Sequence, residues 1–155
     1  MLVDIENRFR AGEIGKSDCD ALKSIIVSSD DESTLESALY IFGRSCRFDP
    51  KIMAVCKRYF LEQPVPGLTA VCMRITFDCW GLWEPYQEVL ARYLDVELYD
   101  EWYDEVLFAC RFCSRLTIEQ ATDSFVPKLT ALLDAARREG LSELLEVAAV
   151  NSSSK

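Results

Sequence analysis

Hydrophobic residues recur along the chain with a period of 33 to 34 positions, and within each period they follow a helical spacing. Leu35, Leu68 and Trp102 are in register. The next register positions hold Leu39, Cys72 and Val106, then Phe42, Ile75 and Ala109, then Cys46, Cys79 and Cys113. Residues at i, i+4, i+7 and i+11 lie on one face of a helix. The pattern therefore predicts one apolar helix face that occurs three times.

A second helix follows the first in each period. Residues 56–60 align with residues 90–94 at an offset of 34. Asp49-Pro50 and Glu84-Pro85 precede these segments, and such pairs suit a helix start because an acidic residue can cap and proline is tolerated in the first turn. In the third period we expect the restart at Thr117 to Glu119, which resembles a capping box. The repeating unit is therefore predicted to be a helix pair.

These pairs predict an all-α fold, a short right-handed α-solenoid that forms one domain over residues 1–150. Its expected parts are a capping pair (1–29), hairpins at 33–62, 66–95 and 100–138, a C-terminal capping helix (141–150) and a flexible tail (151–155). In the last hairpin, Pro127 either kinks the second helix or marks its start. Stacks of this kind usually bind other proteins, so recognition is the expected role.

The charge balance narrows the choice of partner. The chain has 17 Lys plus Arg against 26 Asp plus Glu, a net charge of −9, which opposes binding to nucleic acid and favours a basic partner. Residues 1–6 have no basic region before an apolar core, so we expect no secretory signal. No apolar run approaches the roughly 20 residues that span a bilayer. We therefore expect a cytoplasmic protein that does not bind membranes.

Cysteine and histidine usage limits the possible chemistry. Seven cysteines are an odd number, and in a reducing compartment we expect them to act as small buried hydrophobes. Cys110 and Cys113 form a CxxC motif, but no second CxxC and no preceding strand supports a redox or metal role over helix packing. The absence of histidine excludes His-based catalysis and His-containing metal sites. We predict no catalytic residue, cofactor or metal.

An acidic run with interleaved aromatics, residues 93–106, is the strongest candidate for a functional surface. It has six carboxylates and no basic residue. One interpretation is a solvated turn, in which Asp100 and Glu101 in a helix's first turn are stabilised by the dipole. Asp104 and Glu105, one turn further along, are explained less easily, because like charges at i and i+4 repel. The other interpretation is an acidic surface with aromatic anchors for a basic protein.

The turn at residues 80–86 holds Trp80, Trp83 and Tyr86, so we expect one tryptophan to pack on the neighbouring repeat and the other to lie exposed beside Glu84. Together with the acidic run, this turn completes the predicted interface. The candidate partner-binding residues are Trp83, Glu84, Asp95, Glu97, Tyr99, Asp100, Glu101, Tyr103 and Asp104.

The order of segments in the first half resembles the HEAT-like class of helical repeats. An apolar helix at 22–26 is followed by an acidic turn at 30–32, by Ala-Leu-x-x-Phe-Gly at 38–43 and by Asp49-Pro50. The resemblance covers about residues 17–138. The period is shorter than the ~40 residues usual for that class.

In size, charge and repeat character the chain is also similar to immunity proteins of bacterial contact-dependent inhibition and other polymorphic toxin systems. The resemblance implies a non-enzymatic monomer that binds one basic toxin domain, for example a nuclease. The acidic run would then mimic substrate phosphates, and Trp83, Tyr99 and Tyr103 would anchor the complex. Two alternatives stay open: a secretion chaperone or assembly adaptor that holds an extended apolar segment, and a lyase or other cofactor-handling enzyme on a HEAT-like scaffold.

Overall fold

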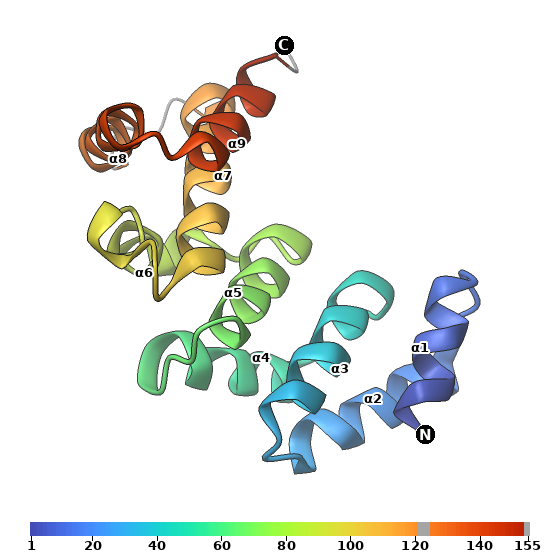
Figure 1. Ribbon diagram of the computed structural model, residues 1–155. Coiled ribbons are helices and arrows are strands. Elements are labelled where there is room, and N and C mark those ends of the chain that lie inside the picture. The colour runs from blue at the N-terminus through green and yellow to red at the C-terminus, as the bar shows by residue number, and fades with distance from the viewer. Residues whose placement is uncertain (121–124, 154–155) are drawn as a thin grey trace. The chain divides into compact units, whose positions relative to one another are not determined.

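The computed structural model describes residues 1–120 and 125–153, and within these ranges the chain is helical and has no strand (Figure 1). The prediction of an all-α fold is confirmed. The α-helices are α1 (Leu2–Arg10), α2 (Lys16–Ser28), α3 (Glu32–Ser45), α4 (Pro50–Lys57), α5 (Leu68–Met73), α6 (Gln87–Arg92), α7 (Tyr103–Gln120), α8 (Val126–Glu139) and α9 (Ser142–Ser153). The π-helical segments η1 (Arg58–Glu62) and η2 (Arg74–Cys79) continue α4 and α5, and η3 (Glu84–Tyr86) and η4 (Val96–Leu98) are short 3₁₀ turns.

The chain divides into two compact units, unit 1 (Met1–Trp83) and unit 2 (Glu84–Lys155). The division falls inside the predicted hairpin 66–95, between its two helices. We expected one domain over residues 1–150, and whether the two units act as one domain stays a prediction.

Aspartate side chains cap the starts of α3 and α4 in unit 1. The Asp31 side chain accepts a hydrogen bond from the Thr34 amide (2.9 Å) at the start of α3. The Asp49 side chain accepts from the amide of Lys51 (2.8 Å) at the start of α4, and Pro50 is the first residue of that helix. Caps of this kind satisfy amides that have no partner within the helix. The predicted helix start at Asp49-Pro50 is confirmed.

The repeated apolar face is buried at its first three positions in unit 1. This holds in α3 and again in α5 and η2, for Leu35, Leu39, Phe42, Leu68, Cys72 and Ile75. The fourth position departs from the pattern, since Cys46 is half-buried and Cys79 is exposed. Cys46 follows the end of α3, and Cys79 is the last residue of η2, where the helical path is ending. The buried helix face in unit 1 therefore comprises the first three of the four register positions, or about two helical turns.

Helices α3 and η2 approach each other closely at Gly43. This glycine is buried, and a Cβ at its position would overlap Cγ1 of Ile75. The absence of a side chain therefore sets the separation of these two helices.

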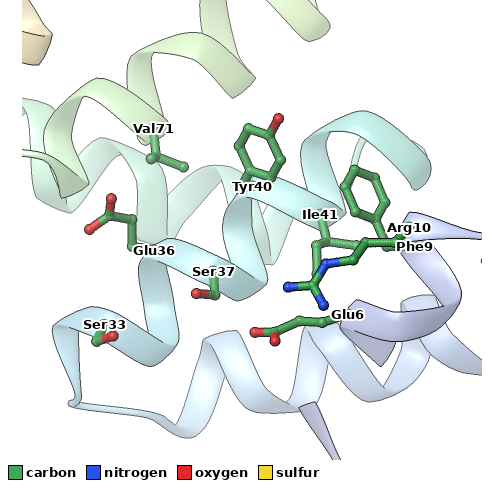
Figure 2. Close-up of a pocket in the computed structure, with 9 residues that line it drawn as sticks. All are labelled: Glu6, Phe9, Arg10, Ser33, Glu36, Ser37, Tyr40, Ile41 and Val71. Carbon is green, nitrogen blue, oxygen red and sulfur yellow. The ribbon is translucent and has the colours of Figure 1, made fainter. Parts of the chain in front are cut away.

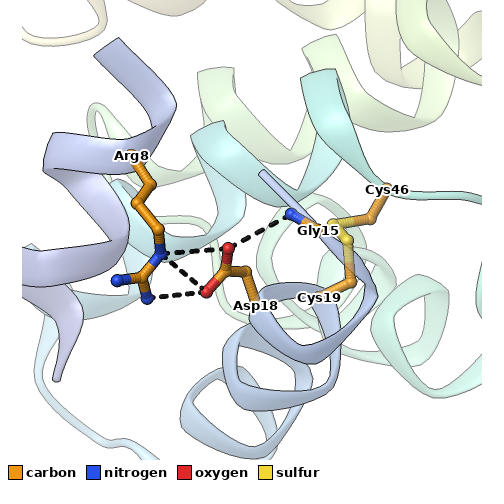
Figure 3. Close-up of a disulfide and its surroundings, with 5 residues drawn as sticks. All are labelled: Arg8, Gly15, Asp18, Cys19 and Cys46. Carbon is orange, nitrogen blue, oxygen red and sulfur yellow. Dashed lines mark hydrogen bonds and ion pairs between the residues drawn. A yellow bond between two sulfur atoms is a disulfide. The ribbon is translucent and has the colours of Figure 1, made fainter. Parts of the chain in front are cut away.

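A disulfide joins Cys19 of α2 to Cys46, with the two Cα atoms 5.8 Å apart (Figure 3). Our expectation that the cysteines act as buried hydrophobes is wrong for this pair, because the packing of α2 on α3 brings them within bonding distance. It is also wrong for Cys79, which is exposed, and it is confirmed for the buried Cys56, Cys72, Cys110 and Cys113.

An ion pair close to the disulfide ties α1 to α2 (Figure 3). Nη2 of Arg8 lies 2.6 Å from Oδ1 of Asp18, and Nε of Arg8 donates to both carboxylate oxygens at 3.0 and 3.1 Å. The backbone amide of Gly15 donates to Asp18 as well (3.2 Å). The Arg8 guanidinium, followed by this amide, lowers the pKa of Asp18 below its ordinary value, because both favour the carboxylate.

In unit 2, α7 packs most extensively against α9, and α8 also packs on α9. Val106, Ala109 and Cys113 of α7 are buried, so the repeated apolar face is present here too. Trp102, which aligns with Leu35, is only half-buried. The face therefore starts one turn later in this copy.

Several predicted boundaries in unit 2 are wrong. The helix expected from Glu84-Pro85 is a 3₁₀ turn followed by the six-residue α6, which ends at Arg92. The helix expected from Asp100 begins at Tyr103, and the restart expected at Thr117 to Glu119 does not occur because α7 continues to Gln120. The helix boundaries in unit 2 therefore do not follow these candidate caps, and boundaries are the part of a helix that sequence patterns predict least well.

Pro127 marks the start of a helix and does not kink one, since it lies in the first turn of α8. The final helix is longer than expected, because α9 continues from Ser142 to Ser153, past Val150. Residues 154 and 155 of the predicted tail lie outside the described residues.

Candidate functional site

Five predicted carboxylates lie exposed in the segment that runs from the end of α6 into the first turn of α7, and we name them the acidic surface: Asp95, Glu97, Asp100, Glu101 and Asp104. No basic residue occurs in the sequence from Tyr93 to Val106. The acidic surface therefore presents a concentrated negative charge to solvent.

A compact turn holds the acidic surface in place. Asp95 caps η4 by accepting a hydrogen bond from the Glu97 amide (3.0 Å). The Trp102 amide then donates to the Leu98 carbonyl (2.8 Å), which closes the turn before α7. Asp100 and Glu101 precede α7, so the expected dipole stabilisation of these two residues in a first helical turn is wrong. The same boundary removes their expected i,i+4 repulsion with the carboxylates of α7.

Two tyrosines accompany the acidic surface. The rings of Tyr99 and Tyr103 lie 5.3 Å apart, and Tyr103 is 37% exposed while Tyr99 is half-buried. A second aromatic pair, Tyr93 and Trp102, has ring centroids 5.6 Å apart, but Tyr93 is buried. Tyr99 and Tyr103 therefore offer aromatic area at the surface, whereas Tyr93 belongs to the core.

Glu105 does not belong to the acidic surface, although it lies in the same acidic run. Glu105 is fully buried in the first turn of α7. Burial raises the pKa of Tyr93, and the nearby charge of Arg92 partly opposes this shift. The negative charge of Glu105 raises the pKa of Tyr93 by a smaller amount. The acidic run thus contributes five exposed carboxylates and one buried carboxylate.

Glu143 of α9 lies close to the acidic surface, and the sequence did not indicate it. Burial raises the pKa of Tyr99, and the charges of Glu143 and Asp100 raise it further. Glu143 is about 40 residues away in the chain, and the packing of α9 on α7 brings it near. Only the tertiary structure could have identified it.

The turn at residues 80–86 splits between the two units. Trp80 packs edge-on against Phe42 (6.5 Å) and Phe48 (5.0 Å), which confirms that one tryptophan packs on the preceding repeat. Trp83, the last residue of unit 1, is half-buried, so the expectation of an exposed tryptophan is met only in part. Glu84 is exposed in η3 and lines a cavity of about 440 Å³ in unit 2. Eight of the nine predicted residues therefore lie in unit 2.

The CxxC pair is buried in α7. Burial raises the pKa of the Cys110 thiol to about 11 and raises that of Cys113 further. Thiols of this kind are poor nucleophiles and poor metal ligands, because both roles need the thiolate. The described residues contain no group of three or more His, Cys, Asp or Glu side chains that could hold a metal ion.

Unit 1 has a cleft of about 520 Å³ at α1 and α3 that was not predicted (Figure 2). Its lining mixes charged, hydroxyl and apolar groups, and comprises Glu6, Phe9, Arg10, Ser33, Glu36, Ser37, Tyr40, Ile41 and Val71. The Phe9 and Tyr40 rings meet edge to face at 5.9 Å. No sequence pattern marks this cleft, since its walls come from helices that are far apart in the chain.

Comparisons with known proteins do not extend this description. No protein-family model matches the chain, and neither the curated proteins nor the solved structures contain a significant match. Among the described residues, no helix combines the length and the apolar character needed to cross a bilayer.

Proposed function

We propose that this protein is a stoichiometric, non-enzymatic binding module whose acidic surface docks on a basic partner protein. The observation that carries the proposal is the exposure of Asp95, Glu97, Asp100, Glu101 and Asp104 in one segment of sequence that has no basic residue, next to the tyrosine pair. Opposite charges steer association and make it sensitive to salt, while tyrosines supply contact area at little entropic cost.

The partner that fits this chemistry best is a toxin domain with a basic active site, and we propose that the protein acts in the cytoplasm as its immunity protein. A nuclease has cationic side chains where substrate phosphates bind. A row of exposed carboxylates resembles the phosphates of a nucleic-acid strand in its repeated negative charge. The proposed architecture for this role is a HEAT-like α-solenoid that binds as a monomer, one to one.

The first experiment is affinity capture from the native host, washed at low and then at high salt. The expected result is one basic protein, recovered at about one to one and released by salt, whose activity the purified chain inhibits. Several unrelated clients would instead favour the chaperone or adaptor, and a retained cofactor would favour the enzyme.

Calorimetry then locates the interface. The variant Asp100→Lys/Asp104→Lys should weaken binding by about a hundredfold or more, because like charges across an interface cost several kcal/mol and 1.4 kcal/mol is tenfold. The matched control is Asp30→Lys/Glu62→Lys, which makes the same charge change at exposed positions of unit 1. Equal affinities for the two variants would rule out the acidic surface as the interface.

A further inference from the structure

The Cys19–Cys46 disulfide lies at the wall of a cavity of about 570 Å³ in unit 1, and both cysteines line it. Both residues are half-buried, in contrast to the fully buried free cysteines of the core. The volume lies within the range of roughly 300–1,000 Å³ that is usual for small-molecule sites. A small thiol in this cavity would therefore meet the disulfide directly.

The cavity lining is locally basic, although the whole chain carries a charge of −9. Lys16, Lys23 and Arg47 line it together with Asp20 and Asp49, which leaves a net charge of +1. Nζ of Lys23 lies 2.6 Å from Oδ2 of Asp49, so these two charges compensate each other. The remaining excess of positive charge favours an anionic ligand over a neutral one.

The two sulfur atoms of the disulfide are not equivalent. Cys19 is the fourth residue of α2, near the positive end of the helix dipole, and Lys16 lies three residues before it on the same face. Cys46 follows the last residue of α3, at the negative end of its dipole. A thiolate is therefore better stabilised at Cys19, which makes Cys19 the better leaving group.

We propose that Cys19–Cys46 is a thiol–disulfide exchange site for a small anionic thiol of the glutathione class. The thiol loses its proton to solvent, and its sulfur attacks Sγ of Cys46. A new disulfide forms between the thiol and Cys46, the Cys19–Cys46 bond breaks, and its electron pair remains on Cys19 as a thiolate. The incoming thiol is oxidised and Cys19 is reduced. In the reverse step the Cys19 thiolate attacks Sγ of Cys46, the mixed disulfide breaks, and the small thiol leaves as its thiolate, which restores the original bond. The site lies in unit 1 and does not depend on the acidic surface.

Mass spectrometry of the oxidised full-length protein tests the exchange. The protein is incubated with reduced glutathione in the absence of oxygen and quenched with acid. Without an oxidant, reduced glutathione can join the protein only by opening an existing disulfide, so Cys79 and the buried thiols do not interfere. The expected product carries one glutathione on Cys46 and a free thiol at Cys19. No adduct in the folded protein, or an adduct mainly on Cys19, would overturn the proposal.

The preference for an anion is tested by comparing rates with glutathione and with neutral 2-mercaptoethanol. The variant Lys16→Gln/Arg47→Gln should slow glutathione by about threefold to tenfold at low salt and leave 2-mercaptoethanol unchanged, because only the anion is attracted by the lost charges. Arg10→Gln/Lys51→Gln removes two exposed cations of unit 1 outside the cavity lining and should change neither rate. Equal slowing of both thiols, or equal slowing in the control, would contradict an anion-selective site.

Discussion

Unit 1 contains 12 acidic and 10 basic residues, whereas unit 2 contains 14 acidic and 7 basic residues. In unit 1, carboxylates are bound by specific groups: Asp18 by Arg8, Asp31 by Thr34 and Asp49 by Lys23, and each of these groups lowers the pKa of its aspartate. In unit 2, the acidic surface lies in a run of sequence that has no basic residue. A carboxylate can therefore serve the fold or remain at the surface for a partner, and the two units differ in which of these prevails.

The units also differ in how they use cysteine. Unit 1 joins two half-buried cysteines in a disulfide, and unit 2 keeps Cys110 and Cys113 as buried thiols in α7. Sγ of Cys110 lies 3.7 Å from the carbonyl oxygen of Leu144 in α9, so this thiol packs between helices. Cysteine therefore forms a covalent link in unit 1, where Cys56 and Cys72 also fill space as buried thiols, whereas in unit 2 it only fills space.

The largest expected effect comes from removing the covalent link. Cys19→Ser/Cys46→Ser should lower the free energy of unfolding by about 3–4 kcal/mol, because the disulfide closes a loop with a sequence separation of 27 residues and so restricts the unfolded chain. Urea unfolding of the oxidised protein measures the change. Cys79→Ser, at an exposed free cysteine, is the control and should stay within about 0.5 kcal/mol of the parent. Equal free energies of unfolding for the two variants would mean that the disulfide does not stabilise unit 1.

The next largest effect is expected at the close approach of α3 and η2. Gly43→Ala should cost about 1–3 kcal/mol, because the new methyl group overlaps Ile75 in a packed interior. Thermal and urea unfolding measure this cost. In an Ile75→Ala background Cγ1 and Cδ1 are removed and only the Cβ atom of that side chain remains, 3.3 Å from the new methyl group. Gly43→Ala should therefore cost much less there, and alanine's preference for helix offsets part of the remaining cost. If Gly43→Ala costs the same free energy of unfolding in both backgrounds, overlap with Ile75 is not the cause of the cost.

A smaller effect is expected at the α4 cap. Asp49→Ala should cost about 1 kcal/mol at neutral pH, because two amides at the helix start lose their acceptor. The Lys23 ion pair, followed by the capping amides, keeps the folded-state pKa of Asp49 below its ordinary value of 3.8. The stabilisation is therefore complete above that value and is lost as the pH falls through the lower folded-state pKa.

Unfolding measured between pH 7 and pH 2 tests this dependence. The stabilities of the parent and of Asp49→Ala should converge at the acidic end. Asp30→Ala, at an exposed aspartate that caps no helix, is the matched control and should parallel the parent at every pH. A difference between the parent and Asp49→Ala that does not change with pH would contradict a stabilising role for the carboxylate.

The smallest effect on stability is expected at the acidic surface. Asp100→Asn/Glu101→Gln should change the free energy of unfolding by no more than about 0.5 kcal/mol, because both side chains are exposed and precede α7. The same variant should bind the partner more weakly and with less dependence on salt. A loss of stability similar to that of Asp49→Ala would mean that the carboxylates of the acidic surface stabilise the fold as those of unit 1 do.

Sequence patterns predicted the helical face and some of its boundaries well. The face at Leu35, Leu39 and Phe42 recurs as buried positions because helical periodicity is a local property that survives in the fold. Asp49-Pro50 starts a helix as expected, whereas Glu84-Pro85 starts only a 3₁₀ turn. Glutamate is a weaker cap than aspartate, and a dipeptide alone does not determine whether a helix continues.

The candidate site could be predicted only in part. The exposure of the acidic surface agrees with its lack of apolar periodicity, but the burial of Glu105 does not follow from its neighbours in sequence. The proximity of Glu143 and the Cys19–Cys46 bond both depend on which helices pack together. Contacts between distant segments require the tertiary arrangement, and no local pattern encodes them.

The boundary at Trp83 and Glu84 has a consequence for how the chain can change over evolutionary time. The apolar pattern repeats every 33–34 residues, whereas cohesion is set by which helices share a core. Because the boundary lies between the two helices predicted for residues 66–95, the repeating segment and the cohesive segment are out of phase by one helix. Gain or loss of residues 66–95 would therefore alter the cores of both units at once.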